Sequence, residues 1–208
     1  MRIVTLSDTH GKHQGLSIPD GDVLIHAGDI TSRGYKNEVV DFFEWFASQN
    51  HPHKIFIPGN HDFFFEVFSS QEVLTSIPKE ITYLNDSGVE IDGIHFWGSP
   101  ITPWFNNWAF NRLRGEDITK HWALIPSNID VLITHGPPQG ILDRTTEGVI
   151  TGCADLLHTV KLIKPSFHIF GHIHEGYGME QSEQTTFLNA SILDGHYQVR
   201  NQPFNIEI

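Results

Sequence analysis

The most informative stretch of this chain is Ile55-Phe56-Ile57-Pro58-Gly59-Asn60-His61-Asp62. It begins as a short apolar strand and ends abruptly in a glycine followed by three polar or titratable side chains. Glycine permits a backbone turn that other residues resist, so the turn would present Asn60 and His61 at the carboxyl edge of a sheet. Open α/β sheets bind their ligands at that edge. The stretch therefore predicts a ligand-binding turn.

The same pattern, an apolar strand that ends in side chains able to bind metal, recurs along the chain. The strand-like runs are Arg2–Ser7 before Asp8-Thr9-His10, Asp22–Ala27 before Gly28-Asp29, Asp130–Thr134 before His135, and Ser166–Phe170 before Gly171-His172-Ile173-His174. Side chains alternate in extended backbone, so we expect each pair spaced by one residue, Asp8 with His10 and His172 with His174, to point the same way. We expect all of these side chains to converge on one cluster.

The other segments predict helices and further strands around these runs. Lys36–Asn50 has helical spacing, with Val39, Val40, Phe43 and Phe46 expected on one face. The remaining expectations are a hairpin over Val89–Trp97 that turns at Asp92-Gly93, an irregular segment over Ser99–Gly115, helices over Glu116–Leu124 and Cys153–Ile163, and strands over Thr185–Ala190 and Phe204–Ile208. Alternation of strands and helices followed by hairpins predicts an α/β layered fold with mixed sheets.

The composition narrows the class of protein. A length of 208 residues suits one domain, which we expect to span residues 1–208. A hydrophobic content of 39% and a charged content of 18% are typical of a soluble globular protein. The net charge of -12 disfavours partners such as long nucleic acids or anionic membranes. The single Cys153 and the strand that starts near Met1 favour a cytoplasmic protein without a signal peptide.

The side chains at the strand ends are oxygen and nitrogen ligands of the kind that bind divalent metals. The candidates are Asp8, His10, Asp29, Asn60, His135, His172 and His174. One ion would need four such ligands at most, so this set predicts two ions that share a carboxylate. No cysteine belongs to the set, which favours Mn²⁺, Fe or Zn²⁺ in a catalytic site over a structural zinc site.

The order of these motifs resembles the calcineurin-like metallophosphoesterase superfamily. Asp-x-His, Gly-Asp, Gly-Asn-His-Asp, His-Gly and Gly-His-x-His follow one another from residue 8 to residue 174. The residues after them, Thr134-His-Gly-Pro-Pro138 and Phe170-Gly-His-Ile-His-Glu-Gly-Tyr-Gly178, with Trp108-Ala-Phe-Asn111, resemble the branch of metallophosphoesterase-domain (MPPED) proteins. The resemblance implies a four-layer α/β-β/α sandwich, with mixed sheets between flanking helices and the site at the strand ends.

The resemblance also implies a role for each candidate. Asp8, His10 and His174 would hold the first ion, and Asn60, His135 and His172 the second. Asp29 would bridge the two ions, which would polarise a shared hydroxide that attacks phosphorus. His61 would face the leaving-group oxygen and donate a proton or a hydrogen bond to it.

One motif departs from the pattern of the superfamily's protein phosphatases. Their bridging Asp is followed by an Asp-Arg-Gly sequence, whose Asp orients the catalytic histidine. Here Ser32 stands before Arg33-Gly34, so protein phosphatase activity is disfavoured and the residue that orients His61 is not identified. Arg33 is a candidate phosphate ligand, with a solvated loop arginine as the alternative. Trp104 and Trp108 are candidate base-stacking residues, with a place in the core as the alternative. Asp62 is expected to cap the helix that follows it, with support of a ligand residue through a hydrogen bond as the alternative.

These observations together predict a phosphodiesterase that depends on two divalent ions, Mn²⁺ in vitro, and acts on small substrates. The resemblance to the MPPED branch implies cyclic nucleotides as the preferred substrates. A phosphomonoesterase and a nuclease of the same fold are alternatives. A non-catalytic nucleotide-binding scaffold is the alternative from another class, although such a protein would be expected to have lost ligands or His61. The sequence does not indicate the native metal, the physiological substrate or the oligomeric state.

Overall fold

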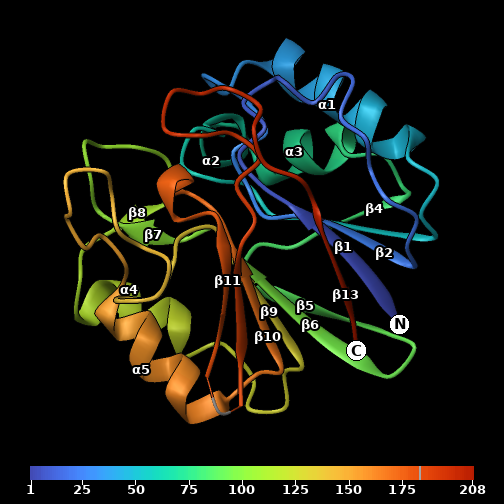
Figure 1. Cartoon of the computed structure of the whole chain (residues 1–208). Coiled ribbons are helices and arrows are strands. Elements are labelled where there is room, and N and C mark those ends of the chain that lie inside the picture. Colours follow the sequence, from blue (N-terminus) through green and yellow to red (C-terminus); the bar gives the residue numbers. More distant parts are fainter. Residues whose placement is uncertain (183) are drawn as a thin grey trace.

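Two β-sheets lie face to face in the middle of the computed structural model, which describes residues 1–182 and 184–208 (Figure 1). The first sheet has the order β13 (Phe204–Glu207), β1 (Arg2–Leu6), β2 (Val23–His26), β3 (His53–Phe56) and β4 (Ile81–Tyr83). The second has the order β11 (Gly178–Gln181), β12 (Thr186–Asn189), β10 (Phe167–Phe170), β9 (Val131–Thr134), β6 (Ile94–Ser99) and β5 (Ser87–Ile91).

Helices cover the outer face of each sheet. Figure 1 shows α1 (Lys36–Ser48), α2 (Phe64–Val67) and α3 (Ser70–Ser76) on the side of the first sheet. On the side of the second sheet lie α4 (Glu116–Trp122) and α5 (Ala154–Ile163). The predicted arrangement of helix, sheet, sheet and helix layers is confirmed.

The strands between these layers are buried on both faces, because alternate side chains point to different layers. In β1, Ile3 packs between the two sheets, with Ile133 and Ile169 of the second sheet in the same cluster. Val4 and Leu6 point the other way and belong to the cluster that includes the helix residues. A run of apolar residues without polar alternation is therefore what a central strand of this sandwich requires.

The parallel strands bring their carboxyl ends to one end of the sandwich. β1 pairs in parallel with β2, and β2 pairs in parallel with β3. In the second sheet, β10 pairs in parallel with both β9 and β12. The two sheets meet at this end, where the backbone N–H of Ser7 donates to the carbonyl of Ala190 at 2.9 Å. The loops that follow five different strands therefore lie together.

The predicted buried face of α1 and the predicted irregular segment were each wrong in part. Val40 is 42% exposed, whereas Phe42, which the prediction omitted, is fully buried with Val39, Phe43 and Phe46. Adjacent residues in a helix point about 100° apart, so Val39 and Val40 cannot share one narrow face. The segment Ser99–Gly115 was expected to be irregular but contains a short parallel pair, β7 (Thr102–Pro103) and β8 (Asn111–Arg112).

Other expectations hold. The hairpin of β5 and β6 turns at Asp92 and Gly93, both with positive φ, as a two-residue type I′ turn requires. The strands β4 and β11 and the helices α2 and α3 were not predicted, because they are short and carry little periodicity. Among the residues that the structure describes, no helix is long and apolar enough to cross a membrane.

The two neighbouring positions on α1 provide a test of its buried face. We expect Phe42→Ala to lower the free energy of unfolding by about 3–5 kcal/mol, because it leaves a cavity among Phe43, Phe46 and Phe56. Val40→Ala should change it by less than about 0.5 kcal/mol, as is usual on a surface. Chemical denaturation of both variants measures the difference. Equal losses would contradict the assigned face.

Candidate metal centre

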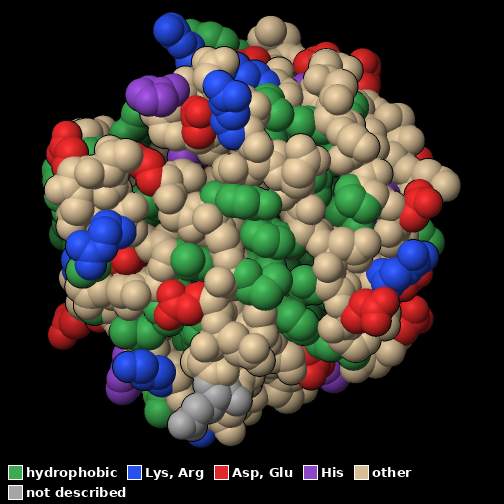
Figure 2. All heavy atoms as spheres, in the orientation of Figure 1, with side chains coloured by type: hydrophobic (Ala, Val, Ile, Leu, Met, Phe, Trp, Pro, Cys, Tyr) green, Lys and Arg blue, Asp and Glu red, His purple; other side chains and the backbone are tan. Residues whose placement is uncertain are grey.

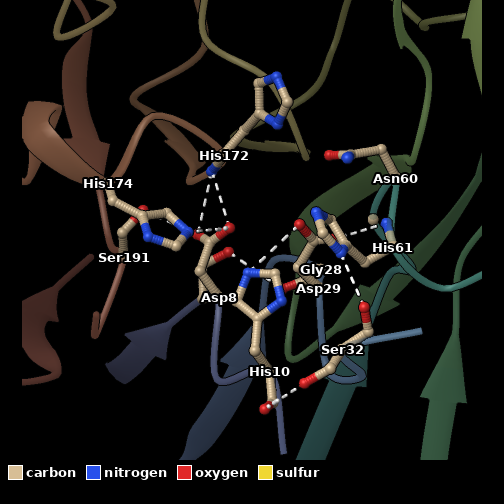
Figure 3. A network of polar contacts seen from close by, with 12 residues as sticks. Asp8, His10, Gly28, Asp29, Ser32, Asn60, His61, His172, His174 and Ser191 are labelled. Carbon is tan, nitrogen blue, oxygen red and sulfur yellow. Dashed lines mark hydrogen bonds and ion pairs between the residues drawn. The ribbon is translucent and has the colours of Figure 1, made fainter. Parts of the chain in front are cut away.

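The polar side chains predicted from the strand ends lie together at the carboxyl end of the sandwich (Figure 3). They come from loops that follow β1, β2, β3, β9 and β10. The ligand atoms form three overlapping groups, each within 4.8 Å: Asp8 with His10 and His174, Asp29 with His135 and His172, and His10 with Asp29 and His61. Asn60 joins them through its side-chain oxygen, 2.8 Å from His135 Nε2.

Four of the seven ligand candidates lie on left-handed rather than extended backbone. Asp8 has φ 55°, His10 φ 42°, Asp29 φ 56° and His172 φ 69°. The expectation that simple alternation aligns the spaced pairs was therefore wrong. Asp8 and His10 do share a ligand group, but His172 and His174 belong to different groups. Non-glycine residues in this conformation cluster at functional sites, where the surrounding structure holds them in place.

Two glycines allow the backbone to approach the buried carboxylates. A Cβ atom at Gly59 would collide with Asp29 Oδ1, and one at Gly171 would collide with Asp8 Oδ2. Gly171 precedes His172, whose backbone N–H donates to both Asp8 oxygens at 3.1 and 3.0 Å. The glycine of each motif is thus required by the position of a carboxylate that lies far away in the sequence.

Three histidines of the cluster use Nδ1 to donate to a backbone carbonyl. His10 donates to Thr31 at 3.1 Å, His174 to Asp194 at 3.1 Å, and His135 to Ala27 at 3.0 Å. Because a carbonyl only accepts, each Nδ1 carries the proton, and Nε2 faces the carboxylates. His10 Nε2 is buried without a hydrogen-bond partner in the ranges 1–182 and 184–208. Such hydrogen bonds orient metal-binding histidines, so the residues fit a metal ion.

Asp29 lies between two sets of ligands. Its Oδ2 is 3.6 Å from His10 Nε2 and 3.3 Å from His135 Nε2, while its Oδ1 accepts from the His61 N–H at 2.7 Å. His10 is shared with the group of Asp8, and His135 with the group of His172. No other aspartate among the described residues takes part in two of the ligand groups.

Burial and neighbouring charges shift the pKa values of the aspartates and histidines in the cluster. Burial raises the pKa of Asp8 and of Asp29, but the facing histidines outweigh it and hold both pKa values well below the usual range. Burial lowers the pKa of His10 and of His172 to about 4, which keeps these rings neutral and free to bind metal. Burial also opposes a charge on His135, yet Asp29 and Asp8 raise its pKa to about 9. His135 thus supplies positive charge of the kind that a bound cation would bring.

His61 lies at the margin of the cluster, where its ring is partly accessible. Its Nδ1 donates to the backbone carbonyl of Ser32 at 3.0 Å. The ring stacks on Trp108, with centroids 4.2 Å apart and planes inclined by 28°. Ser32 therefore contacts His61 through a carbonyl at the position where the protein phosphatases have a carboxylate.

Asp62 was expected to cap the following helix, and that expectation was wrong. Its carboxylate is buried and accepts hydrogen bonds from the N–H groups of Ile30, Thr31 and Gly59 and from the Thr31 hydroxyl. Burial, with the negative charge of Asp29, raises the pKa of Asp62 to about 7. Asp62 joins the loop of Asp29 to the loop of Asn60, so it fixes two ligand-bearing turns against each other.

Ser191 is a residue of the site that the sequence did not indicate. Its Oγ donates to Asp8 Oδ2 at 2.7 Å from the chain that leaves β12 (Figure 3). The only available signal was the position of Ser191 just after a strand-like run, and serine at a strand end has many other uses. Its contact with Asp8 depends on a fold that brings together residues far apart in the sequence.

The candidate substrate residues lie at different places around the site. Trp104 is 54% exposed and lines a cavity of about 410 Å³ that also reaches Pro137, Ile150 and His172. Trp108 instead stacks on His61. Arg33 is exposed, and its backbone N–H donates to Glu38. Of these three candidates, Trp104 is the one that lines the cavity beside His172.

The contact between Ser191 and Asp8 has a measurable consequence. We expect Ser191→Ala to bind Mn²⁺ about 10–100-fold more weakly, as is typical when a residue that orients a ligand is lost. Isothermal titration calorimetry on metal-free protein measures the change. Ser48→Ala, an exposed serine on α1, is the matched control and should bind as the wild type. Equal affinities for all three proteins would show that Ser191 does not orient Asp8.

Comparison with known proteins agrees with this fold. Residues 1–176 match the family model of the calcineurin-like phosphoesterases. The whole chain is 41% identical to metallophosphoesterase domain-containing protein 1 of Homo sapiens and of Mus musculus, and the match covers 71% of each. A solved structure with 18% identity superposes with a TM-score of 0.67 over 90% of this chain and 89% of that one, which supports the fold alone. The chain belongs to the calcineurin-like metallophosphoesterases.

Proposed function

We propose that this protein hydrolyses small phosphodiesters, with cyclic nucleotides preferred, by means of two divalent metal ions. Asp8, His10 and His174 would hold one ion, Asn60, His135 and His172 the other, and Asp29 both. When bound, such ions polarise phosphoryl oxygens and generate a nucleophile from water at neutral pH. The position of Asp29 carries the proposal, because its oxygens lie beside histidines of both ligand sets.

The residues of the chain have two tasks in this reaction. The buried carboxylates and the neutral rings of His10 and His172 keep their lone pairs directed at the centre of the cluster. His61 protonates the leaving-group oxygen. Its Nδ1 proton is held by Ser32, so Nε2 is the atom left to exchange a proton with the substrate.

The cavity beside His172 supports a small substrate with a planar group. Its volume of about 410 Å³ is in the range of small-molecule sites. Trp104 offers a ring on which a base could stack, a contact typically worth about 1–3 kcal/mol per base. The net charge of -12 gives a long polyanion no general attraction. These features favour a cyclic mononucleotide over DNA or RNA.

The shared position of Asp29 predicts how metal binding responds to substitution. We expect the wild type reloaded with Mn²⁺ to hold two ions, Asp29→Asn to weaken both, and His174→Ala to empty chiefly one. Metal analysis after dialysis measures the content. The exposed residues Asp20 and His158 provide matched controls, as Asp20→Asn and His158→Ala. One tightly bound ion with full activity would contradict the two-ion mechanism.

A second prediction separates proton donation by His61 from metal binding. We expect His61→Ala to keep its metal content but to lose about 10²–10⁴-fold in kcat on a diester with an alkoxide leaving group, the usual contribution of a general acid. A p-nitrophenolate leaving group needs little protonation, so the loss should be much smaller for bis-p-nitrophenyl phosphate. Equal losses on both substrates would place His61 in metal support or phosphate binding.

The substrate class is tested by a screen of the Mn²⁺-loaded enzyme over monoesters, cyclic nucleotides and long DNA and RNA at physiological salt. We expect 2′,3′- or 3′,5′-cyclic nucleotides to be hydrolysed faster than polymers or monoesters. Trp104→Ala should raise KM for the nucleotide more than for bis-p-nitrophenyl phosphate, because only the nucleotide has a base to stack. Leu113→Ala, at an exposed residue nearby in sequence, is the control. Faster cleavage of polymers or of monoesters would overturn the proposed substrate.

A further inference from the structure

The indole of Trp108 covers one face of the His61 ring. The ring centroids are 4.2 Å apart and the planes are inclined by only 28°, which is a stacked contact. The edge-to-face contact with His10, at 4.6 Å and 87°, comes from a second loop. The backbone carbonyl of Ser32 holds Nδ1 from a third loop. Three independent contacts therefore restrict the tilt, the position and the rotation of the imidazole.

The loop that carries Trp108 is fixed to the loop that carries His61. Ala109, the next residue, is fully buried and its N–H donates to the carbonyl of Asn60 at 3.1 Å. The N–H of Phe110 donates to Glu66 at 3.0 Å. These bonds place Trp108 relative to the residues on both sides of His61, so the stacking does not depend on a free surface side chain.

The loop also closes on itself. Asn111 accepts from the N–H of Phe105 at 2.8 Å and donates to the Thr102 hydroxyl at 2.8 Å. Between these ends, Asn106 and Asn107 both have positive φ and turn the chain so that Trp108 points back at His61. Asparagine tolerates this conformation better than most residues. The two asparagines before Trp108 are thus explained by the placement of its indole ring.

We infer that Trp108 is a positioning residue for proton donation by His61, and that it acts together with the Ser32 carbonyl where related phosphatases use a carboxylate. The inference rests on the proposed role of His61 as general acid. Aromatic rings favour offset face contacts of this kind, which fix the plane of the partner. Trp108 would therefore affect the step that needs a proton on the leaving group, rather than the binding of a base.

The test compares Trp108→Leu and Trp108→Phe with the wild type on two diesters. For 2′,3′-cyclic AMP, whose leaving group is an alkoxide, we expect Trp108→Leu to lower kcat about tenfold, a part of the 10²–10⁴-fold available to a general acid. The change on bis-p-nitrophenyl phosphate should stay below about twofold, since that leaving group needs little protonation. Trp108→Phe keeps a ring face and should recover most of the loss. Trp45→Leu is the matched control, because Trp45 lies on α1 and packs on His13 rather than on His61.

A nuclear magnetic resonance readout on metal-free protein is independent of activity. A proton that lies over an aromatic face is shifted upfield, so the ring signals of His61, identified by their loss in His61→Ala, should move downfield in Trp108→Leu. They should keep their position in Trp45→Leu. If Trp108→Leu does not fold, cross-peaks between the His61 and Trp108 ring protons of the wild type show whether the two rings are in contact.

Three results would overturn the inference. They are equal losses of kcat on the two diesters, a rise in KM for the cyclic nucleotide with kcat unchanged, or His61 ring signals whose chemical shifts are the same in Trp108→Leu as in the wild type. The second result would make Trp108 a base-binding residue. Failure of the proposed function is distinguishable, because the wild type would then hydrolyse neither diester while the magnetic resonance result still decided whether Trp108 stacks on His61.

Discussion

Two carboxylates buried in one place are the constraint on which the rest of the structure depends. Asp8 is 0% and Asp29 2% exposed, and burying a charge is costly unless the charge is paired and hydrogen-bonded. The N–H groups of His172 and His61 and the hydroxyl of Ser191 donate to them, and imidazoles lie around them. These partners come from both sheets, so the cluster is complete only when the sheets are packed together. Divalent cations would complete the compensation of charge.

Much of the fold and the identity of the clustered residues could be predicted from sequence. Continuous apolar runs such as those of β1 and β9 identified strands, and their alternation with helical segments indicated a layered α/β fold. The resemblance to the metallophosphoesterases implied its four layers. A metal-type ligand at the end of each run was informative because parallel strands end at one edge. Asp8 and His174, far apart in the chain, were therefore expected together, and they share a ligand group.

The rest could not be predicted because it depends on contacts between distant loops. Left-handed backbone at Asp8, not strand alternation, brings it to the cluster, and nothing in an Asp-Thr-His sequence shows this. The hydrogen bonds of Asp62 cross between two turns, which local reasoning replaced with a helix cap. The contact of His61 with Ser32 uses a backbone carbonyl, which every residue has and no motif can display. Trp108 acts through the face of its ring, and composition alone cannot tell such a ring from a core residue.

The central claim is that Asp29 lies between two metal ions in one cluster. The most direct measurement is anomalous X-ray diffraction at the manganese edge from crystals of the Mn²⁺-loaded protein. The account predicts two anomalous peaks about 3.5–4 Å apart, with Asp29 between them. One peak should lie beside Asp8 and His174, and the other beside His135. A single peak at full occupancy, or two peaks that do not both contact Asp29, would contradict it.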